Sequence, residues 1–245
     1  MSRPTIGFTQ RIQLEWLEWT AQLALAGLSP DEIYAELQER LRPIVSVGGD
    51  DNKSNRGKVV GILLKIWVKN PKDLRSFGNE GLAHLEQAPE DQHLALHWGM
   101  SMATYPFFGT VAEATGRLAD LQGGVTKEQV HRRVQEQYGQ RPSIKRGMER
   151  AFYSLHDWGV LEPTEQAHVY QAARPLVIDN SRLTSWLIEA SMISKGVQSM
   201  PVADAVRQPA LFPFAISSTN VENNGRMELI YQGLDNEILM RSTGV

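Results

Sequence analysis

The sequence predicts a mainly α-helical protein with small β elements. Apolar residues recur at helical spacing through the first hundred residues and again after residue 107. Only short stretches alternate between apolar and polar residues, at 160–178 and 214–233. We therefore expect a helical N-terminal domain (residues 1–104), a mixed domain (105–179), and a C-terminal helix with a β-hairpin (180–245).

Composition excludes several functional classes. Of the 245 residues, 42% are hydrophobic and 22% are charged, which is typical of a globular protein. The absence of cysteine rules out disulfides, thiol catalysis and cysteine-ligated zinc, and it fits a cytoplasmic location. The most apolar run, residues 59–68, is too short to span a bilayer and contains Lys65. We therefore expect a cytoplasmic protein that has no membrane partner.

Helix start and stop signals order the first hundred residues. A helix is expected over 10–26, because its apolar residues share one face and Gly27 follows. Ser29 and Glu32 have capping-box spacing, so a second helix should begin there and end near residue 41. Further helices are expected to end at residue 68 and to cover residues 74–86 and 91–103.

Three more helices and two strands are expected next. The first helix, from residue 107, closes on two glycines, and the second begins at a Thr126–Gln129 capping box. A short turn at 140–142 leads into the third helix, which Gly159 ends. The stretches VLEP and HVYQAARPLVI then predict two strands around a turn at 164–167. The buried face of the third helix should contain Ile144, Met148, Ala151, Phe152, Leu155 and Trp158.

The last part of the chain predicts one helix and one hairpin. SRLTSWLIEASMISKG has helical spacing. FAISSTNVENNGRMELIYQG alternates on both sides of Asn223-Asn224-Gly225, which is a typical hairpin turn.

Residues 107–178 resemble the winged helix-turn-helix domains of prokaryotic DNA-binding proteins. The features that match are the capped VTKEQV helix, the short turn into RPSIKR, and SLHDWGVLEP leading into the wing. The resemblance covers under a third of the chain, and it implies that the third helix enters the major groove of double-stranded DNA. Over the whole chain, the helical first half, the SLxDWGxL helix end and the small C-terminal segment are similar to the BrxA-like accessory proteins of bacteriophage-exclusion (BREX) systems. That similarity implies a role in phage defence.

A local excess of positive charge supports DNA binding. Residues 125–150 contain seven cations and three anions, in a chain whose net charge is −3. Phosphate contacts are expected from Lys127, Arg132 and Arg133 in the second helix. Contacts to bases or phosphates are expected from the third helix and the turn before it, through Arg141, Ser143, Lys145, Arg146 and Arg150.

A second function is also compatible with this pattern. Winged helices also serve in non-catalytic protein–protein interactions, and the wing tip EPTEQAH is acidic, with Glu162 and Glu165 and no lysine or arginine. The sequence is thus compatible with a transcription regulator, a subunit of a DNA-handling or phage-defence assembly, or a protein-interaction subunit. A homodimer would suit paired DNA half-sites.

No motif indicates an enzyme, a metal site or a cofactor. His93 and His97 have metal-ligand spacing, but Leu94 replaces the glutamate of HExxH, so we expect a packed or surface pair. The glycine-rich stretch Val47–Lys58 does not match the spacing of a phosphate-binding loop and should be a loop. No serine lies in a GxSxG context.

Overall fold

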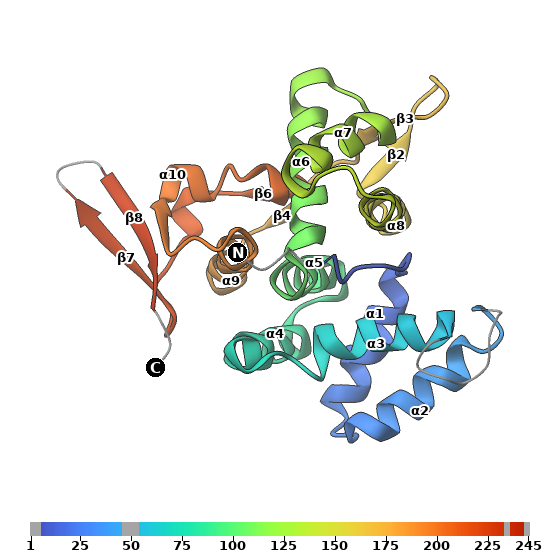
Figure 1. Ribbon diagram of the computed structural model, residues 1–245. Coiled ribbons are helices and arrows are strands. Elements are labelled where there is room, and N and C mark those ends of the chain that lie inside the picture. The colour runs from blue at the N-terminus through green and yellow to red at the C-terminus, as the bar shows by residue number, and fades with distance from the viewer. Residues whose placement is uncertain (1–5, 46–53, 233–235, 243–245) are drawn as a thin grey trace.

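The computed structural model describes residues 6–45, 54–232 and 236–242, and it confirms a mainly helical chain with small sheets (Figure 1). The first five helices are α1 (Leu14–Leu25), α2 (Pro30–Leu41), α3 (Asn55–Trp67), α4 (Arg75–Gln87) and α5 (His93–Thr104). The 3-10 turns η1 (Lys72–Leu74) and η2 (Glu90–Gln92) lead into α4 and α5. The Ser29 hydroxyl accepts from Glu32 N–H, and the Glu32 carboxylate accepts from Ser29 N–H, so the predicted capping box of α2 is confirmed.

Two predictions about this region were wrong at helix ends. The first helix begins at Leu14 rather than residue 10, because residues 6–13 form a non-helical arm that packs against a later helix. The predicted loop 47–58 is helical from Asn55, because the Ser54 hydroxyl accepts from Gly57 N–H and starts α3. The remainder of that loop, through residue 53, lies outside the described residues.

The middle of the chain has the order helix, strand, helix, helix, strand, strand. Its helices are α6 (Pro106–Gln122), α7 (Lys127–Tyr138) and α8 (Pro142–Asp157), and its strands are β1 (Val125–Thr126), β2 (Leu161–Pro163) and β3 (Val169–Ala172). The strands form an antiparallel sheet in the order β1-β3-β2. Thr126 and Gln129 cap α7 reciprocally, as predicted, and Gly139 follows its end.

The stretch predicted as the second wing strand belongs to two different sheets. Strand β3 ends at Ala172, and β4 (Leu176–Ile178) pairs in parallel with β6 (Phe214–Ile216). Pro175 lies between them, where it lacks the N–H that a continuous ladder would need. The chain therefore leaves the small sheet after β3 and crosses to α9 (Ser181–Lys195).

The C-terminal hairpin uses different strands from those predicted. Strand β7 (Met227–Gln232) pairs with β8 (Asn236–Arg241), and β5 (Ser199–Pro201) pairs with the other edge of β8. The predicted Asn223-Asn224-Gly225 turn instead precedes β7, where Asn224 bridges to Met227. The shorter elements of this region are α10 (Val202–Ala205), η3 (Pro209–Leu211) and η4 (Ser218–Asn220).

One continuous apolar core joins these parts. It extends from Phe8 in the arm through α5 and α9 to Leu239 in β8. Strands β2 and β3 and the β7–β8 hairpin stand at opposite sides of the molecule, with α5 and α6 between them (Figure 1). Within the described ranges, no helix combines the length and the apolar character needed to cross a membrane.

Candidate nucleic-acid interface

Helix α8 has one buried face and one exposed face. All six residues predicted for its packed face are buried, and Phe152 and Leu155 have no exposed area. The helix starts at Pro142, whose missing N–H costs nothing in the first turn, and Gly159 follows its end with φ +72°. Because the apolar face packs on α6 and α7, the opposite face of α8 is directed outward.

The structure brings four of the predicted contacts together on this outward face. Ser143, Lys145, Arg146 and Arg150 are exposed, and among the described residues none of them forms an ion pair or a side-chain hydrogen bond. Arg132 on α7 is also exposed and unpaired within the same ranges. These side chains can therefore exchange water for a ligand without first breaking an internal contact.

The other three predicted contacts are engaged within the protein. Lys127 Nζ lies 3.2 Å from Glu149 Oε1, and it also lies over the ring of Tyr153. Partial burial opposes the charge, but Glu149 and Tyr153 raise the pKa of Lys127 above its usual value. Arg133 pairs with Glu136 at 3.2 Å, and Arg141 Nη2 donates to the Tyr138 carbonyl at 3.3 Å.

The N-terminal arm holds α8 from the side. Ile12 N–H donates to Ser154 Oγ at 2.8 Å, and Trp158 Nε1 donates to the Ile12 carbonyl at 2.8 Å. Arg11 pairs with both carboxylate oxygens of Asp157. The arm thus ties the start of α1 directly to α8.

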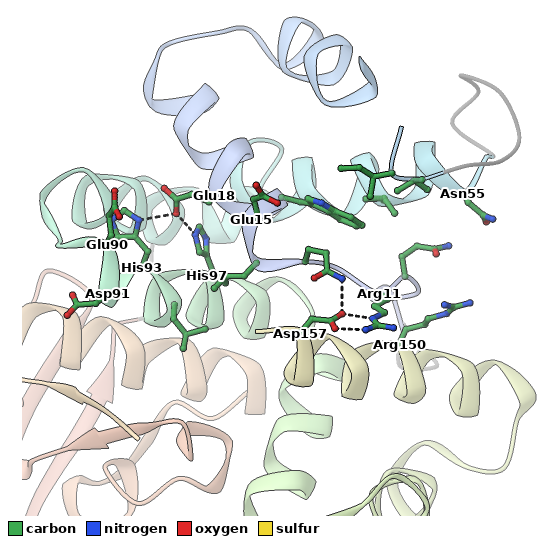
Figure 2. A pocket seen from close by; sticks show the side chains of 18 residues that line it. Arg11, Glu15, Glu18, Asn55, Glu90, Asp91, His93, His97, Arg150 and Asp157 are labelled. Atoms are coloured by element: carbon green, nitrogen blue, oxygen red, sulfur yellow. Dashed lines mark hydrogen bonds and ion pairs between the residues drawn. The ribbon is translucent and has the colours of Figure 1, made fainter. Parts of the chain in front are cut away.

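A cleft of about 1360 Å³ separates α8 from the N-terminal helices. The arm, α1, the start of α3, α5 and α8 all contribute to its lining. Figure 2 shows Arg150 and Asn55 at one end of this cleft and His93 and Glu18 at the other. Arg150 therefore borders the cleft, whereas Arg146 is not part of its lining.

The histidine pair at the far end of the cleft is packed, which is one of the two arrangements predicted, and shares one carboxylate. His93 Nδ1 lies 2.9 Å and His97 Nε2 lies 2.8 Å from Glu18 Oε2 (Figure 2). Trp67 Nε1 donates a hydrogen bond to His97 Nδ1 at 3.1 Å. The neutral ring therefore carries its proton on Nε2, and this N–H donates a hydrogen bond to Glu18. Burial lowers the pKa of His97, which favours this neutral form.

Because both nitrogens of His97 are engaged, this pair is poorly suited to hold a metal ion. In the part of the chain that the structure describes, no group of three or more histidine, aspartate or glutamate side chains could hold a metal ion.

We expect the contact between Glu18 and the two histidines to lose its contribution to folding stability at acid pH. Burial alone would raise the pKa of Glu18, but hydrogen bonds from His97, Gln22 and His93 outweigh it and lower the pKa to about 2. The stabilisation of the folded state by the Glu18 contact is therefore complete above the unfolded-state pKa near 4.5. It is lost as the pH falls toward the folded-state pKa of about 2. Urea unfolding at pH 7, 4 and 3 should show Glu18→Gln less stable than wild type at pH 7, with a smaller difference at pH 3. An equal difference at all three pH values would contradict this assignment.

Sequence reasoning missed Glu18, Arg11 and Tyr153. Glu18 contacts histidines that lie 75 or more residues away in the sequence, and Arg11 contacts Asp157, 146 residues away. No local spacing could reveal these pairs. Tyr153 could have been found, because helical spacing places it on the same face as Arg146 and Glu149.

Comparisons of the chain with protein-family models, with curated proteins and with solved structures found no match.

Proposed function

We propose that this protein binds double-stranded DNA through α8 of a winged helix-turn-helix formed by α6 to β3, residues 106–172. The order α6-β1-α7-α8-β2-β3 and the sheet order β1-β3-β2 support this proposal. In such domains the helix that follows the turn enters the major groove, and the strands after it form the wing. Here α7 and α8 are joined by residues 139–141, which is the short connection that this motif needs.

The observation that carries the proposal is the unpaired basic face at the start of α8. Ser143, Lys145 and Arg146 lie in its first turns, and Arg150 follows one turn after Arg146. Lysine and arginine at such positions neutralise phosphates or bond guanine O6 and N7. Their charges are not offset by internal ion pairs within the described ranges, so the face can supply the electrostatic part of DNA affinity.

A titration of duplex DNA at about 50 and about 200 mM salt tests the proposal. Wild type should bind and should weaken steeply with salt, because each neutralised phosphate releases counterions. The Arg146→Ala/Arg150→Ala variant should bind at least roughly tenfold more weakly, and the slope of log affinity against log salt should fall by about two. Of the single variants, Arg146→Ala should have the larger effect, because Arg150 borders the cleft.

The matched control is Lys72→Ala/Arg75→Ala, which removes the same charge from exposed side chains near α4. This control should bind as wild type does, and both double variants should keep the wild-type thermal unfolding midpoint. Absence of binding by wild type at low salt would refute the proposal. Equal weakening by both double variants would show an effect of net charge rather than of α8.

The protein-interaction alternative is favoured by one observation, the acidic wing tip. Glu162 in β2 and Glu165 in the turn between β2 and β3 are both exposed, and they would repel phosphates. Under this alternative, the α8 variants would have the same affinity for duplex DNA as wild type, and they would instead lose binding to a protein partner. The roles as a regulator or as a subunit of a phage-defence assembly, and the homodimer, stay predictions.

A further inference from the structure

Glu149 lies in the middle of the outward face of α8. At about 100° per residue, Glu149 projects between Lys145 and Arg146, which lie four and three residues earlier. Its side chain is 27% exposed, so it contacts solvent as well as the protein. A ligand that covers Lys145 and Arg146 would therefore also meet this carboxylate.

The carboxylate of Glu149 is held by α7 rather than by its neighbours on α8. Lysine four residues before glutamate on one helix can form an ion pair, yet Glu149 Oε1 pairs with Lys127 Nζ at 3.2 Å. Lys127 is itself positioned by the ring of Tyr153, whose centroid lies 5.5 Å from Nζ. Within the described ranges Glu149 Oε2 makes no hydrogen bond, so this oxygen can accept one from a ligand.

A carboxylate on a DNA-binding face can accept a hydrogen bond from only two groups in the major groove, the amino groups of cytosine N4 and adenine N6. It repels phosphates and can only accept hydrogen bonds, whereas guanine O6 and N7 and thymine O4 are acceptors too. Adenine N6 lies beside the acceptor N7 of the same base, which repels a carboxylate, whereas cytosine presents no acceptor on its major-groove edge, so cytosine N4 is the donor that glutamate favours. Glu149 would thus cost general affinity and supply discrimination between base pairs.

We infer that Glu149 is a specificity-determining residue that accepts a hydrogen bond from a cytosine amino group, and that Lys127 is its positioning residue. This inference rests on the proposed function of α8. It reassigns Lys127, which the sequence predicted as a phosphate contact. The pair is partly exposed, at 26% for Lys127 and 27% for Glu149, and ion pairs of that exposure contribute little to folding.

The test begins with selection of preferred sites from a randomised duplex library by wild type, followed by titration of single-base-pair variants of the selected site. Wild type should prefer C·G at one position by roughly tenfold or more over the other pairs. Glu149→Gln should lose most of that preference at this position alone. It should also bind unselected duplex as tightly as wild type or more tightly, because a charge that repels phosphate is gone.

Glu136→Gln is the matched control, because it removes one carboxylate from the same basic segment at a site on α7 that is 64% exposed. It should keep the base preference of wild type. A uniform loss of affinity in Glu149→Gln, with a lowered unfolding midpoint, would show a structural role and overturn the inference. Retention of the preference in Glu149→Gln would overturn it as well, while leaving DNA binding by α8 in place.

Lys127→Met tests the positioning role separately. It should weaken the preference at the same base pair that Glu149→Gln affects, because the carboxylate is no longer held toward the groove. Equal weakening on all duplexes would instead make Lys127 a phosphate contact and would contradict its positioning role. If wild type binds no duplex at low salt, both the inference and the proposed function fail. Binding without any base preference overturns only the inference.

Discussion

Replacement of Arg226 by methionine should lower the free energy of unfolding by about 3–5 kcal/mol, the range expected when one partner of a buried ion pair is removed. Arg226 Nε and Nη2 donate to the two carboxylate oxygens of Glu189 at 2.9 and 2.8 Å, and the guanidinium also pairs with Glu80. The side chain of Glu189 is only 2% exposed, so loss of Arg226 leaves a buried carboxylate without its partner. Urea unfolding followed by circular dichroism measures the difference.

This contact anchors the C-terminal hairpin to the helices. Arg226 immediately precedes β7, Glu189 lies on α9 and Glu80 lies on α4. The matched control is Arg182→Ala, because Arg182 is 78% exposed and lies 3.9 Å from Glu222, and it should change stability by less than about 1 kcal/mol. The Arg226→Met/Glu189→Leu variant should recover part of the loss, because it removes the unpaired charge. A loss below about 1 kcal/mol in Arg226→Met would contradict the buried ion pair.

Replacement of Trp158 by alanine should cost about 3–5 kcal/mol as well, because it opens a cavity in the core. Trp158 is 4% exposed and lies against Phe108 and Trp98, with ring centroids 5.3 and 5.9 Å away. It also donates to the Ile12 carbonyl, so its loss frees the N-terminal arm from the end of α8. Thermal and urea unfolding measure the effect.

Trp158→Phe separates the two contributions of this side chain. Phenylalanine keeps most of the buried ring area but cannot donate to Ile12, so the expected loss is about 1–2 kcal/mol.

Because Trp158 joins the arm to α8, we expect the wild-type N-terminal helices and α8 to unfold in one transition. Two separate transitions in wild type would show that the arm does not couple them. An equal loss in Trp158→Phe and Trp158→Ala would assign the whole effect to the hydrogen bond.

Local signals in the sequence were sufficient for most helices. The capping boxes of α2 and α7 and the glycines after α7 and α8 act within a few residues, so their spacing is visible in the chain. All six residues predicted for the buried face of α8 are buried, because helical periodicity requires no knowledge of what packs on it, although Gly147 and Ser154 are buried as well. For the same reason, the outward position of Ser143, Lys145, Arg146 and Arg150 followed from the sequence.

Pairing between distant segments was not visible in the same way. The arm has an apolar pattern that continues into α1, and its contacts with Ser154, Asp157 and Trp158, all more than 140 residues away, are not visible in local spacing. Strand β4 pairs with β6, 38 residues further along the chain, and no turn motif joins the two. The Asn223-Asn224-Gly225 motif is a strong hairpin signal, yet Asn224 closes a bridge to Met227 before β7 and does not join two long strands.

The sequence by itself therefore determined the helical class, the helix caps and the side of α8 that carries the basic residues, because each depends on neighbours within one or two turns. The tertiary structure decided which of those basic residues have no internal ion pair or hydrogen bond within the described ranges and so remain available to a ligand. It paired Lys127 with Glu149 across two helices, and it brought Glu18 to two histidines 75 and 79 residues away. It also placed Arg150 at the edge of a cleft. Such contacts depend on how whole elements pack against one another, and local spacing in the chain does not encode that packing.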